Sequence, residues 1–211
     1  MRRITIPRQL DTADPNGICL DQTTGGAGNL LINGALASGG IATLDIQRRV
    51  TLESAANLSA ITFTITGTDQ EGKPVTEAIA GPNATTTTTT KDFLTITQIA
   101  VSAAVGTNVE IGTSAVGGSQ IIPLDQYLTP FNVSLRVEVV GTVNYTVQYT
   151  FNDVFDPDSD PTDFIWQDHV DLTALAVTAE ATFISPVTAA RILTNSGIGT
   201  ATLYVLQAGV Q

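Results

Sequence analysis

Aspartates form the densest group of side chains in this chain that could do chemistry. Seven of them lie within residues 153–171, around the segment DPDSDPTD. Carboxylates at positions i, i+2 and i+4 are oxygen ligands of the kind that Ca²⁺ prefers, so Asp156, Asp158 and Asp160 are candidate calcium ligands. An EF-hand loop that started at Asp156 would need glycine in sixth place and glutamate in twelfth, where this chain has proline and glutamine. The pattern therefore favours a solvated loop stiffened by prolines, and we expect no metal site.

Residues for other chemistries are scarce. His169 is the only histidine and Cys19 the only cysteine, so the chain alone cannot build a multi-histidine metal site, a thiolate cluster or an internal disulfide. The G-x-S-x-G, phosphate-loop and dinucleotide motifs are all missing. Paired carboxylates could hydrolyse sugars, but the aromatic residues that would line such a cleft are few and mostly spaced like core residues. We expect His169 to be a packed side chain, and we expect no catalytic residues, no cofactor and no enzyme.

The elements that must position any site are strands. Within Ile61–Val101, Ile61, Phe63 and Ile65 alternate with threonines, which predicts a half-buried strand. The segment 68–73 supplies a turn in which glycine can take the left-handed conformation, and a return strand follows. Six threonines, Thr85–Thr90, then form a polar stretch that predicts an extended edge, with a solvated hairpin as the alternative.

A second alternating pair follows later in the chain. Residues 133–139 and 143–151 each place apolar side chains at every second position, and Gly141-Thr142 lies between them. The pattern predicts a hairpin with one apolar face, which needs a second sheet to cover it. Later strands in residues 172–182, 188–195 and 201–207 can supply that sheet.

These elements predict an all-β protein with little helix. We expect two antiparallel β-sandwich-like units, at residues 21–117 and 118–211, behind an extended N-terminal arm at residues 1–20. The short, uncharged segment GTSAVGGS (112–119) is the expected linker. A single larger sandwich is the alternative.

The charge distribution limits the partners. The formal net charge is −11, so we expect no binding to nucleic acid, and no apolar run approaches the roughly 20 residues of a membrane span. The arm is the basic exception, because Arg2, Arg3 and Arg8 precede the first acidic residue. We expect these three arginines to contact an acidic protein surface, with a solvated terminus as the alternative. On the threonine edge, we expect Thr85, Thr87 and Thr89 to contact a partner.

Three segments resemble tailed-bacteriophage virion structural proteins. They are GTDQEGKPVTEAIAGPNA with its threonine run and FLTITQIAVSAA (67–104), the C-terminal PVTAARILTNSGIGTATLYVLQAG (186–209), and the opening MRRITIPRQLD. The likeness lies in the turn, the G-P-N corner, the alternating threonine strands and the terminal LQAG strand. Capsid decoration (cement) proteins are the nearest match in kind.

The resemblance implies a protein that binds and stabilises the assembled head shell. Its partners would be the major capsid protein or other virion proteins, and it would form a homo-oligomer, a dimer or trimer. Its place would be the virion, after synthesis in the host bacterial cytoplasm, because no apolar segment typical of a secretion signal follows the arginines of 1–10. The alternative is a neck-associated, tail-associated or fibre-like protein that binds a host surface glycan through residues 81–92 or 153–168.

Overall fold

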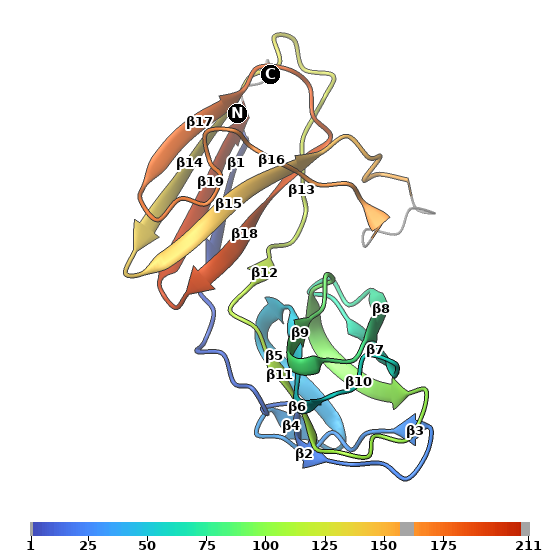
Figure 1. The fold of residues 1–211 in the computed structure, drawn as a ribbon. Helices are drawn as coiled ribbons and strands as arrows, with labels where there is room; N and C mark the ends of the chain where they lie inside the picture. Colours follow the sequence, from blue (N-terminus) through green and yellow to red (C-terminus); the bar gives the residue numbers. More distant parts are fainter. Residues whose placement is uncertain (1, 157–162, 208–211) are drawn as a thin grey trace. The chain divides into compact units, whose positions relative to one another are not determined.

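The computed structural model describes residues 2–156 and 163–207. The fold is nearly all β, with 55% of the described residues in strands and 1% in helix, as expected from the sequence. The chain divides into two compact units. One, here called the continuous unit, is Thr12–Gly117, and the other, the split unit, joins Met1–Asp11 to Gly118–Gln211. Figure 1 traces the strands of each.

The continuous unit has two antiparallel sheets. The first has six strands, in the order β4 (Ala37–Ser38), β5 (Ile41–Arg48), β10 (Phe93–Val101), β7 (Thr62–Thr68) and β8 (Pro74–Ala80), with β3 (Gly28–Asn29) also paired to β10. The second has four, in the order β2 (Cys19–Gln22), β11 (Val109–Thr113), β6 (Val50–Asn57) and β9 (Asn83–Thr88).

The expected pair of strands at one edge of the first sheet is present. β7 and β8 pair from Thr62 opposite Ala80 to Thr68 opposite Pro74. Their turn is closed by a hydrogen bond from the Lys73 backbone N–H to Asp69 Oδ1 (2.8 Å), and Gly72 has a φ of 80°, which favours glycine.

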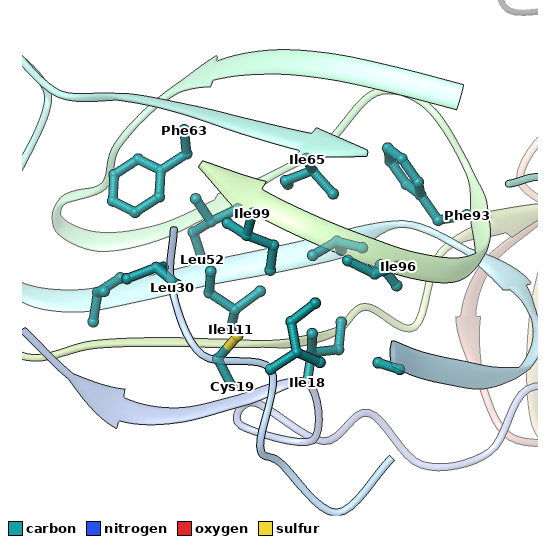
Figure 2. Packing of buried hydrophobic residues seen from close by; sticks show 14 of the residues in the cluster. Ile18, Cys19, Leu30, Leu52, Phe63, Ile65, Phe93, Ile96, Ile99 and Ile111 are labelled. Atoms are coloured by element: carbon teal, nitrogen blue, oxygen red, sulfur yellow. The ribbon is translucent and has the colours of Figure 1, made fainter. Parts of the chain in front are cut away.

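Both sheets contribute to one buried hydrophobic cluster. Figure 2 shows Phe63, Ile65 and Ile99 from the first sheet packed near Leu52 and Ile111 from the second. The β10 residues that enter this core do not follow strict alternation: Phe93, Ile96, Ile99 and Val101 are all buried. Two register shifts, one on each side of β10, let residues three apart reach the same face.

The split unit also has two antiparallel sheets. One has four strands, in the order β1 (Arg2–Arg8), β19 (Thr200–Gln207), β14 (Val133–Val140) and β17 (Ala179–Phe183). The other runs β12 (Gly117–Gly118), β18 (Ala189–Gly197), β15 (Val143–Thr150) and β16 (Gln167–Asp168), with β13 (Ile122–Pro123) also paired to β18. The two sheets share a second buried cluster. A sandwich geometry for either unit stays a prediction.

The expected hairpin at 133–151 is wrong. β14 and β15 belong to different sheets, so the chain crosses between sheets at Gly141-Thr142, and it crosses again between β18 and β19. The two crossings touch, because Gly199 N–H donates to the Thr142 carbonyl at 2.8 Å. A hairpin and a crossing of this kind have the same period-2 pattern, since each needs one apolar face per strand.

The prediction that the N-terminal residues form an extended arm outside the sheets is also wrong. Arg2–Arg8 is strand β1, and it pairs along its whole length with β19, from Arg2 opposite Gln207 to Arg8 opposite Ala201. Ile6 in this strand is 7% exposed and joins the core of the split unit. The rest of residues 1–20, from Thr12 on, belongs to the continuous unit, which ends at Gly117.

Candidate interaction surface

One face of the sheet β1–β19–β14–β17 carries charged and aromatic side chains. The residues at alternate positions of each strand, such as Ile6, Leu203 and Val137, are buried in the core. The intervening residues therefore lie on the opposite, outer face. Cross-strand register places them in two adjacent rows, one of Arg3, Leu206, Ser134 and Thr182, the other of Thr5, Tyr204, Arg136 and Glu180.

Polar contacts tie this outer face together. The Arg3 guanidinium carbon is 5.2 Å from the centroid of the Tyr204 ring, a cation–π contact. The Tyr204 hydroxyl donates to Glu138 Oε2 at 3.0 Å, and this hydrogen bond is the main reason that the pKa of Tyr204 is raised. Arg136 Nη1 lies 3.3 Å from Glu180 Oε1. Arg3, Tyr204, Arg136 and Glu180 are among the residues that line a shallow hollow of about 570 Å³.

The charged groups of this face are open to solvent. The side chains of Arg136 and Glu180 are 51% and 70% exposed, so their ion pair contributes little to folding. Within residues 2–156 and 163–207, no carboxylate forms an ion pair with Arg3. The face therefore presents guanidinium groups that can accept further acidic partners.

The three arginines expected to contact a partner have different positions. Arg3 is exposed on the outer face. Arg2 lies at the start of β1, opposite Gln207. Arg8 is 1% exposed, so the prediction that its side chain contacts a partner is wrong. The alternation along β1 turns Arg8 to the same side as Ile6.

The threonine run forms an outer strand of its sheet. β9 pairs with β6 on one side, and the described part of the chain supplies no strand for its other side. Thr85 is exposed and Thr87 is half-buried, and the contact of these two residues with a partner stays a prediction. Thr89 is 1% exposed, and its Oγ1 accepts from Val50 N–H at 2.9 Å, so its expected partner contact is wrong.

The structure describes only part of the aspartate-rich segment 153–171. Asp158 and Asp160 lie outside the described residues, and Asp156 is exposed. In the described ranges, no group of three or more His, Cys, Asp or Glu side chains is arranged to hold a metal ion.

Carboxylates also gather on the second sheet of the continuous unit. Glu110 in β11 lies directly across from Glu53 in β6. Partial burial raises the pKa of Glu110, and the charges of Asp21, Glu53 and Asp14 raise it further. The group is a site of like-charge repulsion.

His169 and Cys19 are both packed side chains. His169 Nδ1 accepts from the Asp171 backbone N–H at 3.2 Å, its Nε2 lies 3.4 Å from the Thr182 carbonyl, and its ring packs on Phe183. Cys19 is fully buried, and burial raises the pKa of its thiol to about 12. Both side chains are therefore packed inside their units rather than exposed as reactive groups.

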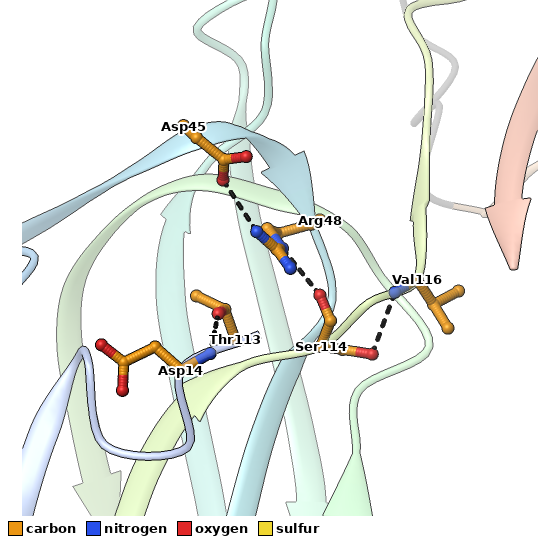
Figure 3. Close-up of polar contacts among 6 residues, drawn as sticks. All are labelled: Asp14, Asp45, Arg48, Thr113, Ser114 and Val116. Carbon is orange, nitrogen blue, oxygen red and sulfur yellow. Dashed lines mark hydrogen bonds and ion pairs between the residues drawn. The ribbon is translucent and has the colours of Figure 1, made fainter. Parts of the chain in front are cut away.

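The sequence did not predict two clusters of polar side chains that the structure contains. In Figure 3, Arg48 lies between Asp45 and Ser114: Nη1 is 3.0 Å from Asp45 Oδ1, and Nε donates to the Ser114 carbonyl at 2.7 Å. Arg48 is 1% exposed, so this contact fixes the end of β5 to the segment after β11. No signal in the sequence could have found it, because the charged run Arg48-Arg49 has the composition of a solvated turn.

The second missed group lies in the split unit. The Arg191 guanidinium carbon is 4.2 Å from the Trp166 ring centroid, and its Nε donates to Gln148 Oε1 at 2.9 Å. Gln148 in turn donates to Asp168 Oδ1 at 2.8 Å. These residues come from three separate segments, so only the strand pairing brings them together.

Comparison of the sequence with known proteins does not assign the chain to a family. No model of a protein family matches the sequence, and no curated protein is significantly similar to it. In the described residues, no helix has the length and hydropathy of a membrane span. The described residues thus form an all-β fold that presents the charged, aromatic face of the sheet β1–β19–β14–β17 and the threonine edge of β9.

Proposed function

We propose that this chain is a structural component of a tailed-phage particle, a decoration protein that binds and stabilises the assembled head shell. Its partners are the major capsid protein or other virion proteins, and it acts as a homo-oligomer in the virion. In this proposal the chain is not an enzyme and binds neither nucleic acid nor membrane.

The observation that carries the proposal is the outer edge of β9. Natural sheets protect their edges with charges, prolines or bulges, because an open edge pairs with other strands. The segment Thr85–Thr88 is made entirely of an uncharged residue type with high β propensity. Its C-terminal end is held in place, since the Glu77 carboxylate accepts from Thr90 N–H at 2.9 Å and from Lys91 N–H at 2.8 Å.

A positioned, uncharged edge is suited to strand addition by a partner. Backbone hydrogen bonds would give the contact its direction, and the threonine side chains would set its register. A single such contact is small, but a protein that occupies every equivalent place on a shell gains from multivalency. The net charge of −11 would help to keep a covered particle soluble.

The phage resemblance falls on strands that matter to the fold. Residues 67–104 run from the end of β7 through β8, β9 and β10, and therefore include the threonine edge. Residues 186–209 contain β18 and β19, which are inner strands of the two sheets of the split unit.

The test is binding to purified, expanded capsids that lack decoration. Co-sedimentation followed by gel densitometry should give a saturating copy number that matches the number of equivalent lattice places. Thr85→Lys should weaken binding, because a charged edge opposes strand pairing. Thr107→Lys is the matched control, since Thr107 is exposed in the loop between β10 and β11.

Two outcomes would contradict the proposal. Capsids that take up only a handful of copies would place the chain elsewhere on the particle. Specific hits on a glycan array, with no capsid binding, would favour the host-recognition alternative.

A further inference from the structure

Opposite charges lie at opposite edges of the outer face of the sheet β1–β19–β14–β17. Arg3 is on β1, at one edge, and Glu180 is on β17, at the other. Between them Tyr204 on β19 and Arg136 on β14 are direct cross-strand partners. The face is thus basic at one edge and acidic at the other, and its middle strands carry Tyr204, Arg136 and the carboxylate of Glu138, which accepts from the Tyr204 hydroxyl.

We propose that this face binds the same face of a second copy of the chain, about a two-fold axis that runs parallel to the strands. Such an axis reverses the strand order, so β1 of one copy lies over β17 of the other and β19 lies over β14. Arg3 then approaches Glu180 of the second copy, and Tyr204 approaches Arg136 of the second copy. Each contact occurs twice, because the interface is two-fold symmetric.

The register of the rows agrees with this arrangement. The axis keeps the position along the strands, so Tyr204 and Arg136, which share a row, meet directly. Arg3 and Glu180 are in adjacent rows, about 7 Å apart along the strand, a gap that an arginine and a glutamate side chain can bridge. A two-fold axis across the strands would instead place β1 over β1 and β17 over β17, so that Arg3 of one copy and Glu180 of the other would lie at opposite edges and could not meet. Charge therefore selects the parallel axis.

The existing contacts on the face allow this exchange. The Arg136–Glu180 pair is solvent-exposed and long at 3.3 Å, so both side chains can turn to new partners at small cost. Arg3 already packs on the Tyr204 ring of its own chain, and in the dimer the Arg136 guanidinium of the second copy would approach the same aromatic group. The hollow bounded in part by Leu206 and Ala181 gives the centre of the interface some apolar area.

The area of the face sets the expected strength. Four strands about 4.8 Å apart, with about seven residues each, make a face of about 450 Å². Standard stable interfaces bury about 800 Å² on each partner. We therefore expect a weak dimer, with a Kd on the order of 100 µM in isolation. The inference rests on the proposed role of the chain as an assembly component.

The experiment is charge reversal followed by sedimentation equilibrium of the purified full chain, without capsids. Arg3→Glu and Glu180→Arg should each weaken self-association about tenfold, because each creates two like-charge contacts per dimer. An equimolar mixture of the two variants should associate at least as well as the unmodified chain. In the mixed dimer the carboxylate introduced at position 3 of one variant faces the guanidinium introduced at position 180 of the other. The second contact in that dimer pairs the original Arg3 and Glu180, so both contacts are again between opposite charges.

The controls separate this inference from a folding defect and from the proposed function. Lys73→Glu reverses an exposed charge in the turn of the continuous unit and should leave the association unchanged. The circular dichroism of each variant should match that of the unmodified chain. A mixture that associates no better than the single variants, or an unmodified chain that stays monomeric near millimolar concentration, would overturn the inference. Normal capsid saturation in that case would leave the decoration role standing.

Discussion

The continuous unit and the split unit use the same alternating strands but connect them differently. In the continuous unit, β7 and β8 are neighbours in both sequence and space and form a local hairpin. In the split unit, β14 and β15 are neighbours in sequence but lie in different sheets, and β1 comes from the other end of the chain.

The difference shows that local pattern and sheet membership are separate properties. A hairpin forms from nearby residues, whereas the split unit closes only when the two ends of the chain meet. Non-local closure costs more loop entropy and places more demand on a few positions. Trp166 lies in the split unit and Cys19 in the continuous unit, so fluorescence and thiol exposure can follow the two units separately.

The largest expected effect is in the continuous unit. Arg48→Met should lower the free energy of unfolding of this unit by about 3 kcal/mol, because Asp45 and the Ser114 carbonyl lose a buried cationic partner. Urea titration with a thiol reagent should show Cys19 becoming reactive at lower denaturant, while the Trp166 transition stays in place. In the native state the thiol should be unreactive, because its pKa is about 12. Arg136→Met, at an exposed pair, is the control.

The next effect concerns the strand that closes the split unit. Ile6→Ala should destabilise this unit by about 2–3 kcal/mol, because Ile6 fills part of its core from β1. The Trp166 transition should shift, and the reactivity of Cys19 should not. Thr5→Ala, an exposed change in the same strand, should have little effect. An unchanged Trp166 transition in Ile6→Ala would mean that β1 is a free arm after all.

A smaller effect distinguishes the crossing from the hairpin. A Cβ at Gly199 would lie 2.7 Å from Thr142 N and 2.7 Å from the Val140 carbonyl oxygen, so Gly199→Ala should cost about 2 kcal/mol through backbone displacement. Gly72→Ala in the β7–β8 turn meets no atom within 4 Å and should cost about 1 kcal/mol, from its φ of 80° alone. Thermal unfolding of both variants measures the difference. Equal costs would argue against the contact between the two crossings.

The smallest effect is a stabilisation. Glu110→Gln should raise the stability of the continuous unit by a few tenths of a kcal/mol at pH 7, because it removes repulsion across β11 and β6. Folding raises the pKa of Glu110, so its cost is absent well below the ordinary value of 4.5 and grows as the pH rises through the raised pKa. The gain should therefore vanish near pH 3. A gain that persists there would point to a cause other than charge.

Much of the fold follows from particular residues. Alternation at Phe63 and Ile65 predicts β7 correctly, Gly72 occupies the left-handed position of the predicted turn, and His169 is a packed side chain, as its isolation predicts. The predictions of a free arm and of a second hairpin are wrong for a shared reason. Period-2 alternation shows that a strand has one buried face, but it does not show which strand lies beside it.

The candidate surface is harder to predict for the same reason. Arg3 is a candidate because it precedes every acidic residue, yet its surroundings depend on Tyr204, which is 201 positions away in the sequence but on the adjacent strand. Arg8 is a candidate by the same argument and lies inside, because the pairing of β1 gives that strand a buried face.

The sequence by itself determined the class of this protein and the faces of its strands. Threonine, valine and isoleucine at alternate positions leave little choice but sheets with one apolar side. The tertiary structure decided which strands share a sheet, and therefore which exposed side chains stand together. Those neighbours come from long-range pairing between the two ends of the chain, and backbone hydrogen bonds, unlike side-chain patterns, carry no sequence signature of their partner.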